Sequence, residues 1–183
     1  MISGLFSAFG LAASAGLNAY IPLLVIALLA RYTDLLTLTP PWDALTHPAI
    51  IGLLAVLAGV EFFADKVPAV NHANDAIQTF IRPVAGAIAF AVGSGAIGRA
   101  HPVLMMAVGL LVAGTVHATK SLAVRPAVTL ATGGAGHTPV SIAEDFLATT
   151  ISLLALLVPL LLGLAALLLL IGVWWRFRRR QST

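Results

Sequence analysis

The stretch FLATTISLLALLVPLLLGLAALLLLIGVWW, residues 146–175, decides the fold class, because it contains no Asp, Glu, Lys, Arg or His. The hydrocarbon core of a bilayer is about 30 Å thick, and a helix of about 20 apolar residues crosses it. At about 1.5 Å per residue this stretch is longer than the core, so we expect its helix to tilt, kink at Pro159 or project beyond the bilayer. Trp174 and Trp175 resemble an aromatic belt, and the arginines that follow resemble a basic anchor. The stretch predicts a membrane-spanning helix.

The composition of the whole chain supports the same class. Of its 183 residues, 60% are hydrophobic and 9% are charged, against roughly 45–50% and about 25% in soluble domains. A soluble domain of this size could not bury so much apolar surface. The absence of cysteine excludes a disulfide scaffold. Four of the ten basic residues are Arg176, Arg178, Arg179 and Arg180, so the basicity is local. We therefore expect the lipid bilayer, and no nucleic acid, as partner.

The other apolar stretches predict further spans, about five in all, in a single integral membrane domain over residues 1–183. The predicted fold is an all-α, polytopic transmembrane helix bundle. In the third span, Ala87, Ala91 and Gly95 recur every four residues, a spacing that lets helix backbones approach closely. The spans are predicted at about 4–30, 48–63, 83–98, 102–119 and 146–175.

The first span contains GLNAYIP, residues 16–22, with a polar amide and a proline at membrane depth. Proline removes a helical hydrogen bond and frees a carbonyl. One interpretation is a kinked span in which Asn18 caps the helix or bonds to a neighbour. The other is a broken or re-entrant pair of helices lining a cavity, with Asn18 beside the path.

The basic residues near the span ends predict the orientation. Five spans place the N-terminus and two polar connections, 61–82 and 117–145, on one face of the membrane. The opposite face receives Arg31, Arg99 and the arginines at the tail. We therefore expect a cytoplasmic C-terminus. The side of the N-terminus reverses if residues 4–30 cross twice.

In the first connection, Glu61 and Asp65 are four residues apart and so lie on one helical face, with Lys66 beside them. A carboxylate at the end of a span costs a few kcal/mol if it faces lipid, so it is expected to face the bundle interior or water. One interpretation is a cation or proton site. The other is an interfacial Glu61 paired with Lys66 or Lys120.

In the second connection, His117 and Lys120 share a helical face. Arg125, which precedes a proline, matches Arg82, which also precedes one. Both arginines are placed to hold an anionic group by forked hydrogen bonds. The alternatives are a histidine bonded to a neighbour and arginines that reach lipid phosphates.

The sequence TLATGGAGHTPVS, residues 129–141, is rich in glycine. Gly133 and Gly134 permit conformations in which successive N–H groups converge on an anion. The alternative is a flexible or re-entrant loop over 126–141. Ser141 and Glu144 fit a capping box that opens the fifth helix, with Asp145 at its positive end. Glu144 and Asp145 are also candidate binding residues.

Four stretches carry a resemblance to a known family, namely residues 16–22, 61–68, 79–83 and the region from 132 to 145. The chain resembles a family of small bacterial integral membrane proteins catalogued as a domain of unknown function, which implies a bacterial cytoplasmic membrane but no activity. After the glycines the chain has His137-Thr138-Pro139 where the family has Asn-Pro. A looser similarity is to proteins that translocate lipid-linked phosphates.

These features favour a transporter or channel for a small ion, polar solute or anionic group, including a lipid phosphate. The second hypothesis is a membrane enzyme, although no His-Glu-x-x-His or Gly-x-Ser-x-Gly pattern is present. We expect the protein to bind no cofactor. The third is a structural subunit of a membrane complex. A homo-oligomer is expected in each case. The candidate metal ligands or acid–base groups of the enzyme are Glu61, Asp65, His72, His117, Glu144 and Asp145.

Overall fold

The computed structural model describes residues 2–66, 68–95 and 101–181, and in that part of the chain every regular element is helical. This confirms the predicted all-α bundle. A 3₁₀ turn, η1, lies in the segment between the second and third helices, and a π-helical turn, η2, follows the fifth. The elements are α1 (Ile2–Leu17), α2 (Tyr20–Tyr32), η1 (Trp42–Thr46), α3 (Pro48–Ala64), α4 (Pro68–Gly93), α5 (Pro102–Thr119), η2 (Lys120–Val124), α6 (Arg125–Thr132) and α7 (His137–Gln181).

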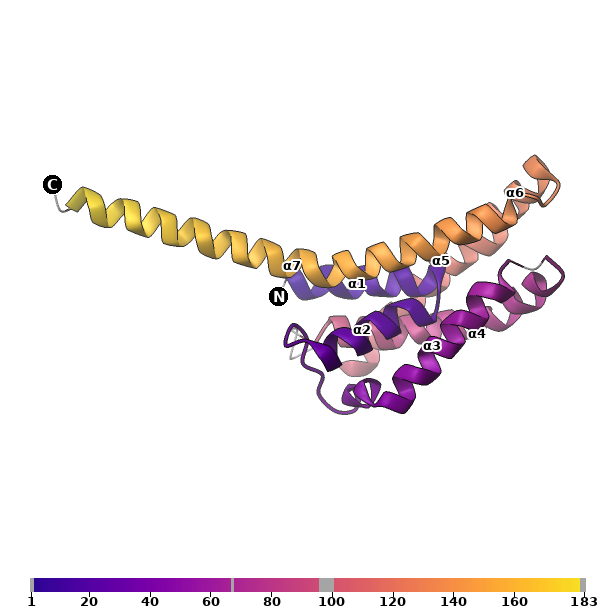
Figure 1. Ribbon diagram of the computed structural model, residues 1–183, viewed down its shortest axis with the longest axis horizontal. Coiled ribbons are helices and arrows are strands. Elements are labelled where there is room, and N and C mark those ends of the chain that lie inside the picture. Colours follow the sequence, from indigo (N-terminus) through magenta and orange to yellow (C-terminus); the bar gives the residue numbers. More distant parts are fainter. Residues whose placement is uncertain (1, 67, 96–100, 182–183) are drawn as a thin grey trace.

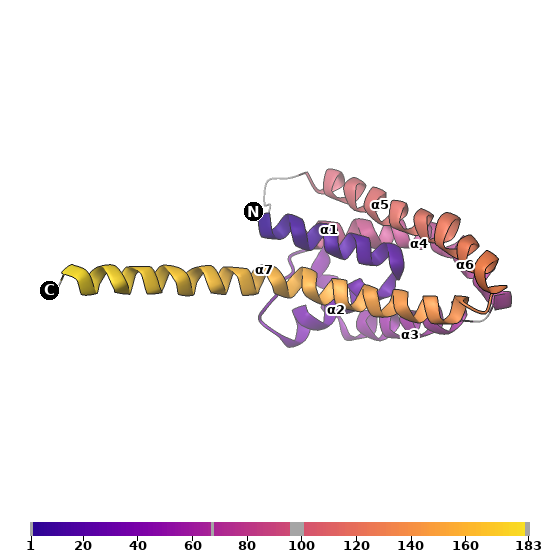
Figure 2. The same cartoon turned by 90° about the horizontal axis from the view of Figure 1, so that it is seen from above.

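The helices run back and forth along one axis (Figure 1). The α1–α2, α3–α4 and α6–α7 junctions lie toward one end of the bundle, which we call the junction end. The start of α1 and the segment between α2 and α3 lie toward the opposite end. Figure 2 shows that α7 packs along the bundle with its first half and extends past it with its second half. The long apolar stretch of the sequence thus belongs partly to the bundle and partly to a projecting helix.

The predicted first span is two helices that run in opposite directions (Figure 1). Helix α1 ends at Leu17, and α2 begins at Tyr20. The side-chain oxygen of Asn18 accepts hydrogen bonds from the backbone N–H groups of Tyr20 (3.1 Å) and Ile21 (3.1 Å). The first span is therefore a broken pair of helices and not a single kinked span, and the Asn18 amide caps the second helix of the pair.

Helix α4 differs from the predicted third span at 83–98. Helix α4 begins at Pro68, passes through Pro83 and ends at Gly93, while residues 96–98 lie outside the described part. A proline inside a helix costs one backbone hydrogen bond. Here the preceding residue, Arg82, is held in buried ion pairs, and these contacts fix the helix across the proline.

The re-entrant loop expected at 126–141 is instead two helices joined by a turn at 133–136. Helix α5 continues through η2 into α6, and α7 already begins at His137. The hydroxyl groups of Thr129 and Thr132 bond to the carbonyls four residues earlier, of Arg125 and Val128, at 3.0 and 2.7 Å. These bonds stay within the helix. Helix α6 ends at Thr132, and Gly133 caps it with a φ of 62°, the left-handed conformation of a helix C-cap.

Many large apolar side chains lie on the outside of this bundle, and several charged ones are buried inside it. Phe6 and Phe146 are 70% and 71% exposed, whereas Arg82 and Glu61 are 0% and 1% exposed, the reverse of a soluble protein. Among the described residues, three helices are long and apolar enough to cross a membrane: Ala73–Gly93, Pro102–Thr132 and His137–Pro159. Three shorter apolar helices accompany them: Gly4–Leu17, Tyr20–Tyr32 and Pro48–Ala64. The protein is therefore a membrane protein whose outer surface contacts lipid.

Small residues bring α4 and α5 into close contact. A Cβ atom added at Gly86 would collide with the Cβ atom of Ala113 and would lie 2.8 Å from the carbonyl oxygen of Gly109. Ala87 and Ala91, two of the predicted small residues, are 4% and 8% exposed. Backbone-to-backbone packing of this kind replaces the hydrophobic driving force that lipid removes.

We expect Gly86→Val to destabilise the protein by about 1–3 kcal/mol, because the added atoms must push α4 and α5 apart. Unfolding of the purified chain in detergent micelles would measure the change. Gly52→Val is the matched control, since a Cβ at Gly52 meets no atom within 4 Å. Equal stability of the two variants would contradict the close packing of α4 on α5.

Candidate functional site

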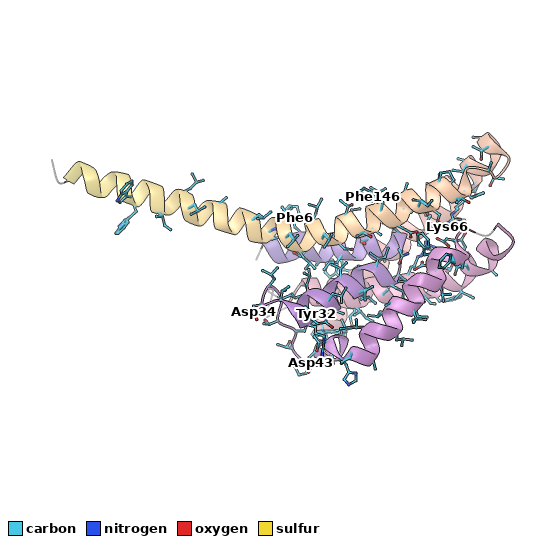
Figure 3. All side chains as sticks on the ribbon, viewed as in Figure 1. Phe6, Tyr32, Asp34, Asp43, Lys66 and Phe146 are labelled. Carbon is cyan, nitrogen blue, oxygen red and sulfur yellow. The ribbon has the colours of Figure 1, made fainter. Side chains whose placement is uncertain are left out.

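Eight ionisable side chains gather at the junction end, and we call them the charge cluster. They comprise four carboxylates and four cations, so the cluster is electrically balanced. Figure 3 shows one member, Lys66, near the end of α3, far from Tyr32, Asp34 and Asp43 at the other end of the bundle. The members are Glu61, Asp65, Lys66, Arg82, Lys120, Arg125, Glu144 and Asp145.

The most deeply buried pair in the cluster joins α3 to α4. The Nη2 and Nε atoms of Arg82 donate to Oε1 of Glu61 at 2.8 and 3.2 Å. The second carboxylate oxygen of Glu61 accepts from the backbone N–H of Ala19 at 3.2 Å. Both oxygens of this buried carboxylate are therefore satisfied, as a charge removed from water requires.

Asp65 lies where three cations meet. Its Oδ2 atom lies 3.3 Å from Lys120 Nζ, 3.3 Å from Arg125 Nη2 and 3.5 Å from Arg82 Nη2. Its Oδ1 atom accepts from the amide of Asn74 at 2.6 Å. Burial raises the pKa of the Asp65 carboxyl, but the charges of Lys120, Arg82 and Arg125 outweigh it and hold the pKa below its ordinary value. Asp65 is thus an ionised carboxylate shared by helices α4, η2 and α6.

Helix α7 contributes two carboxylates. Glu144 Oε2 lies 2.9 Å from Lys120 Nζ and 3.5 Å from Arg125 Nη2. Asp145 Oδ2 pairs with Lys66 at 3.0 Å, and its Oδ1 atom accepts from the amide nitrogen of Asn18 at 3.0 Å. The two acids thus tie α7 to α3, to the η2–α6 segment and to the break between α1 and α2.

The cluster also satisfies the two helix ends at that break. Lys120 donates to the carbonyl of Leu17 at 3.2 Å, and Arg82 lies 3.5 Å from the carbonyl of Gly16, both at the C-terminal end of α1. Glu61 accepts from Ala19 at the N-terminal end of α2. Cations therefore face the negative end of one helix dipole, and an anion faces the positive end of the other. The break and the cluster stabilise each other.

His117 lies beside the cluster and is neutral. Its Nδ1 atom is 3.1 Å from Nη1 of Arg82, which can only donate, so Nδ1 carries no proton. Its Nε2 atom is 3.1 Å from the Thr79 hydroxyl, which itself donates to the carbonyl of Asp75 at 2.8 Å. The interpretation of His117 as a histidine bonded to its neighbours matches this geometry.

Two sequence interpretations near α7 require correction or a different role. The capping box is wrong: α7 begins at His137, so Ser141 and Glu144 lie inside the helix, and Glu144 pairs with cations instead. Gly133 and Gly134 have φ values of 62° and 94° and form the turn after α6, and no described contact places them in the charge cluster. The local pattern was overridden by the tertiary ion pairs.

The metal-ligand arrangement of the enzyme hypothesis does not form in the part of the chain described here. Within those residues, no group of three His, Cys, Asp or Glu side chains could hold a metal ion. The side chain of His72 lies outside the described part. The carboxylates of the cluster are instead engaged by cations.

Sequence reasoning missed two contributors, Thr79 and the π turn η2. Asn74 and Thr79 bond to Asp65 and His117, and both lie on the polar first half of α4. Thr79 gave no signal, because this polar half of α4 was not expected to continue into the third span. The π turn η2, whose wide bond joins Arg125 N to Lys120 O, has no sequence signature either.

Comparison with known proteins bears on the whole chain. Residues 5–179 match the model of a family described as a domain of unknown function. Comparisons with curated proteins and with solved structures gave no match. The family match includes α2 to α6 entirely, most of α1 and α7, and every member of the charge cluster. The chain therefore belongs to this family, the domain of unknown function DUF4126.

Proposed function

We propose that the protein is a membrane transporter or channel for a small ion or polar solute, and that the charge cluster is its site. One observation carries the proposal: six ionisable side chains, from α3, α4, η2, α6 and α7, form one connected set of buried ion pairs over a broken helix. The six are Glu61, Asp65, Arg82, Lys120, Arg125 and Glu144.

The cost of such a set argues for a function. A buried pair loses several kcal/mol of hydration per ion, and apolar replacements are often equally stable. Ionisable groups inside membrane proteins commonly mark ion or substrate pathways. A helix that is broken beside the site, with its two exposed ends facing bound groups, is a common feature of transporter binding sites. The combination supports transport better than a purely structural role.

The geometry suggests how the site would work. Asp65 shares its Oδ2 atom among three cations on different elements, so a small relative movement of these elements can exchange its partners. Glu61 and Asp65 would carry a proton or cation, and Arg82 and Arg125 would bind an anionic group. Asn18, fixed between α2 and Asp145, would line the path.

We also propose a bacterial cytoplasmic membrane, a cytoplasmic C-terminus and a homo-oligomer. The arginines at the end of α7 support the orientation through the excess of basic residues on cytoplasmic faces. Because α1 and α2 run in opposite directions, the start of α1 lies toward the same end of the bundle as the projecting half of α7 (Figure 1). The N-terminus is therefore assigned to the same side as the C-terminus, unlike the five-span prediction.

Transport by the reconstituted chain tests the proposal. Liposomes would be assayed for uptake of radiolabelled sodium, of radiolabelled phosphate and of protons through an entrapped pH-sensitive dye. We expect at least one flux above that of empty liposomes, and we expect Glu61→Gln to reduce it about tenfold or more, because the carboxylate beside Arg82 is lost.

Asp43→Asn serves as the control, since Asp43 lies in η1 at the opposite end of the bundle. It should transport like the wild-type chain. Wild-type liposomes without any of the three fluxes would refute the proposal for these ions. A Glu61→Gln variant that is folded and fully active would remove the cluster from the mechanism.

A further inference from the structure

We infer that Arg125 and Ser141 form a binding site for a phosphate group. The inference rests on the proposed function and names the chemical class of the cargo. Among the four cations of the charge cluster, one is held more loosely than the others.

Arg125 is the cation that the cluster can release. Its two carboxylate contacts are long, 3.3 Å to Asp65 and 3.5 Å to Glu144, and both use the single nitrogen Nη2. Asp65 keeps Lys120 and Arg82 as partners without it, and Glu144 keeps Lys120 at 2.9 Å. The removal of Arg125 from either carboxylate therefore leaves no buried acid without a cation.

The rest of the guanidinium is unoccupied. Nε and Nη1 of Arg125 are buried and have no hydrogen-bond partner among the described residues, although the residue is only 5% exposed. The hydroxyl of Ser141 is likewise buried and unpartnered, with the residue 0% exposed. Ser141 lies three residues before Glu144 on α7, so the two side chains share a helical face. Glu144 in turn contacts Arg125. Unsatisfied donors at such depth cost free energy until an acceptor occupies them.

The donor chemistry selects the ligand class. Nε and Nη1 offer three N–H bonds in a rigid plane, and the serine offers one O–H. A phosphate group presents several acceptor oxygens and is the group that arginine commonly binds in proteins. The same group occurs on a free phosphate ion and on a lipid headgroup, so both sources have to be tested.

Binding to the purified full-length chain in detergent tests the inference without requiring transport. Radiolabelled inorganic phosphate and a short-chain phosphatidic acid are the two probes. We expect saturable binding of at least one probe. Arg125→Lys keeps a positive charge near Asp65 but loses Nε and Nη1, and we expect about tenfold weaker binding, the loss of a charge-assisted hydrogen bond. Ser141→Ala should weaken binding about fivefold.

Two conservative variants are matched controls. Arg31→Lys changes an arginine that bonds to Thr46 at the other end of the bundle, and Ser94→Ala changes a buried serine that bonds to Ala91. Both should bind like the wild-type chain. Binding of the free ion alone, or of the lipid alone, supports the inference and identifies the source. Absence of saturable binding by both probes, or unchanged binding in both Arg125→Lys and Ser141→Ala, overturns it. If the site binds phosphate but the liposomes show no flux, the proposed function fails while this inference stands.

Discussion

Arg82→Ala is expected to lower the free energy of unfolding by about 3–5 kcal/mol, because it removes one partner of a buried ion pair. Arg82 is fully buried and binds Glu61 through two nitrogens. Without it, the Glu61 carboxylate keeps only the backbone N–H of Ala19 as a partner. The bond from Arg82 to His117 is lost as well. Denaturant-induced unfolding in mixed micelles would measure the change.

A double variant separates the structural role of this pair from its functional role. Glu61→Leu combined with Arg82→Met replaces both charges with apolar groups of similar size, and such replacements are often neutral for stability or stabilising. We therefore expect the double variant to regain most of the stability lost in Arg82→Ala and to remain inactive in the liposome assay.

Arg31→Ala is the control for Arg82→Ala, because Arg31 is exposed and its guanidinium donates a hydrogen bond to the carbonyl oxygen of Thr46. It should change stability by less than about 0.5 kcal/mol. If Arg82→Ala were as stable as Arg31→Ala, the buried Glu61–Arg82 pair would not exist in the folded protein. An active double variant would show instead that the charges serve stability alone.

The sequence was sufficient to predict the fold class and the place where charges gather. Only 9% of the residues are charged, so the few acids and bases near span ends had to satisfy one another or face water. Glu61, Asp65, Lys120 and Arg125 were therefore recognisable as candidates before their contacts were known. The spacing of Glu61 and Asp65 placed them on one helical face, and both contact Arg82.

The partners within the cluster could not be predicted, because they depend on how helices distant in sequence are arranged. Pro83 suggested the start of a helix, yet Arg82 and Pro83 lie inside α4. Ser141 and Glu144 have the spacing of a capping box, but Glu144 pairs with Lys120, 24 positions earlier in the chain. In both cases the helix continues through the position where a local rule predicted its start, and a buried ion pair forms there with a residue distant in sequence.

The π turn η2 explains how two basic residues five positions apart reach the same carboxylates. In a regular α-helix, Lys120 and Arg125 would point about 140° apart around the axis. The wider turn, with its bond from Arg125 N to Lys120 O, brings both onto one side, where each contacts Asp65 and Glu144. A π turn of this kind is an α-helix with one residue added, and such turns are frequent at functional sites.

Deletion of Leu122 is therefore expected to preserve the charge cluster, whereas deletion of Leu111 should disrupt it. Without Leu122, which is 78% exposed, the wide turn can close to a regular one, and Lys120 and Arg125 become neighbours at a spacing of four. Leu111 is similarly exposed, at 65%, but lies in the regular helix α5. Its loss rotates the two parts of that helix by about 100° relative to each other.

That rotation would turn either Gly109, which packs on Gly86, or His117 and Lys120 away from their partners. We expect the Leu111 deletion to yield little folded protein by size-exclusion chromatography in detergent, and the Leu122 deletion to stay within about 1 kcal/mol of the wild-type stability, since no buried group is lost. If the two deletions destabilised the protein equally, η2 would not be an α-helical turn with one residue added. In that case the placement of Arg125 beside Asp65 would need the full length of η2.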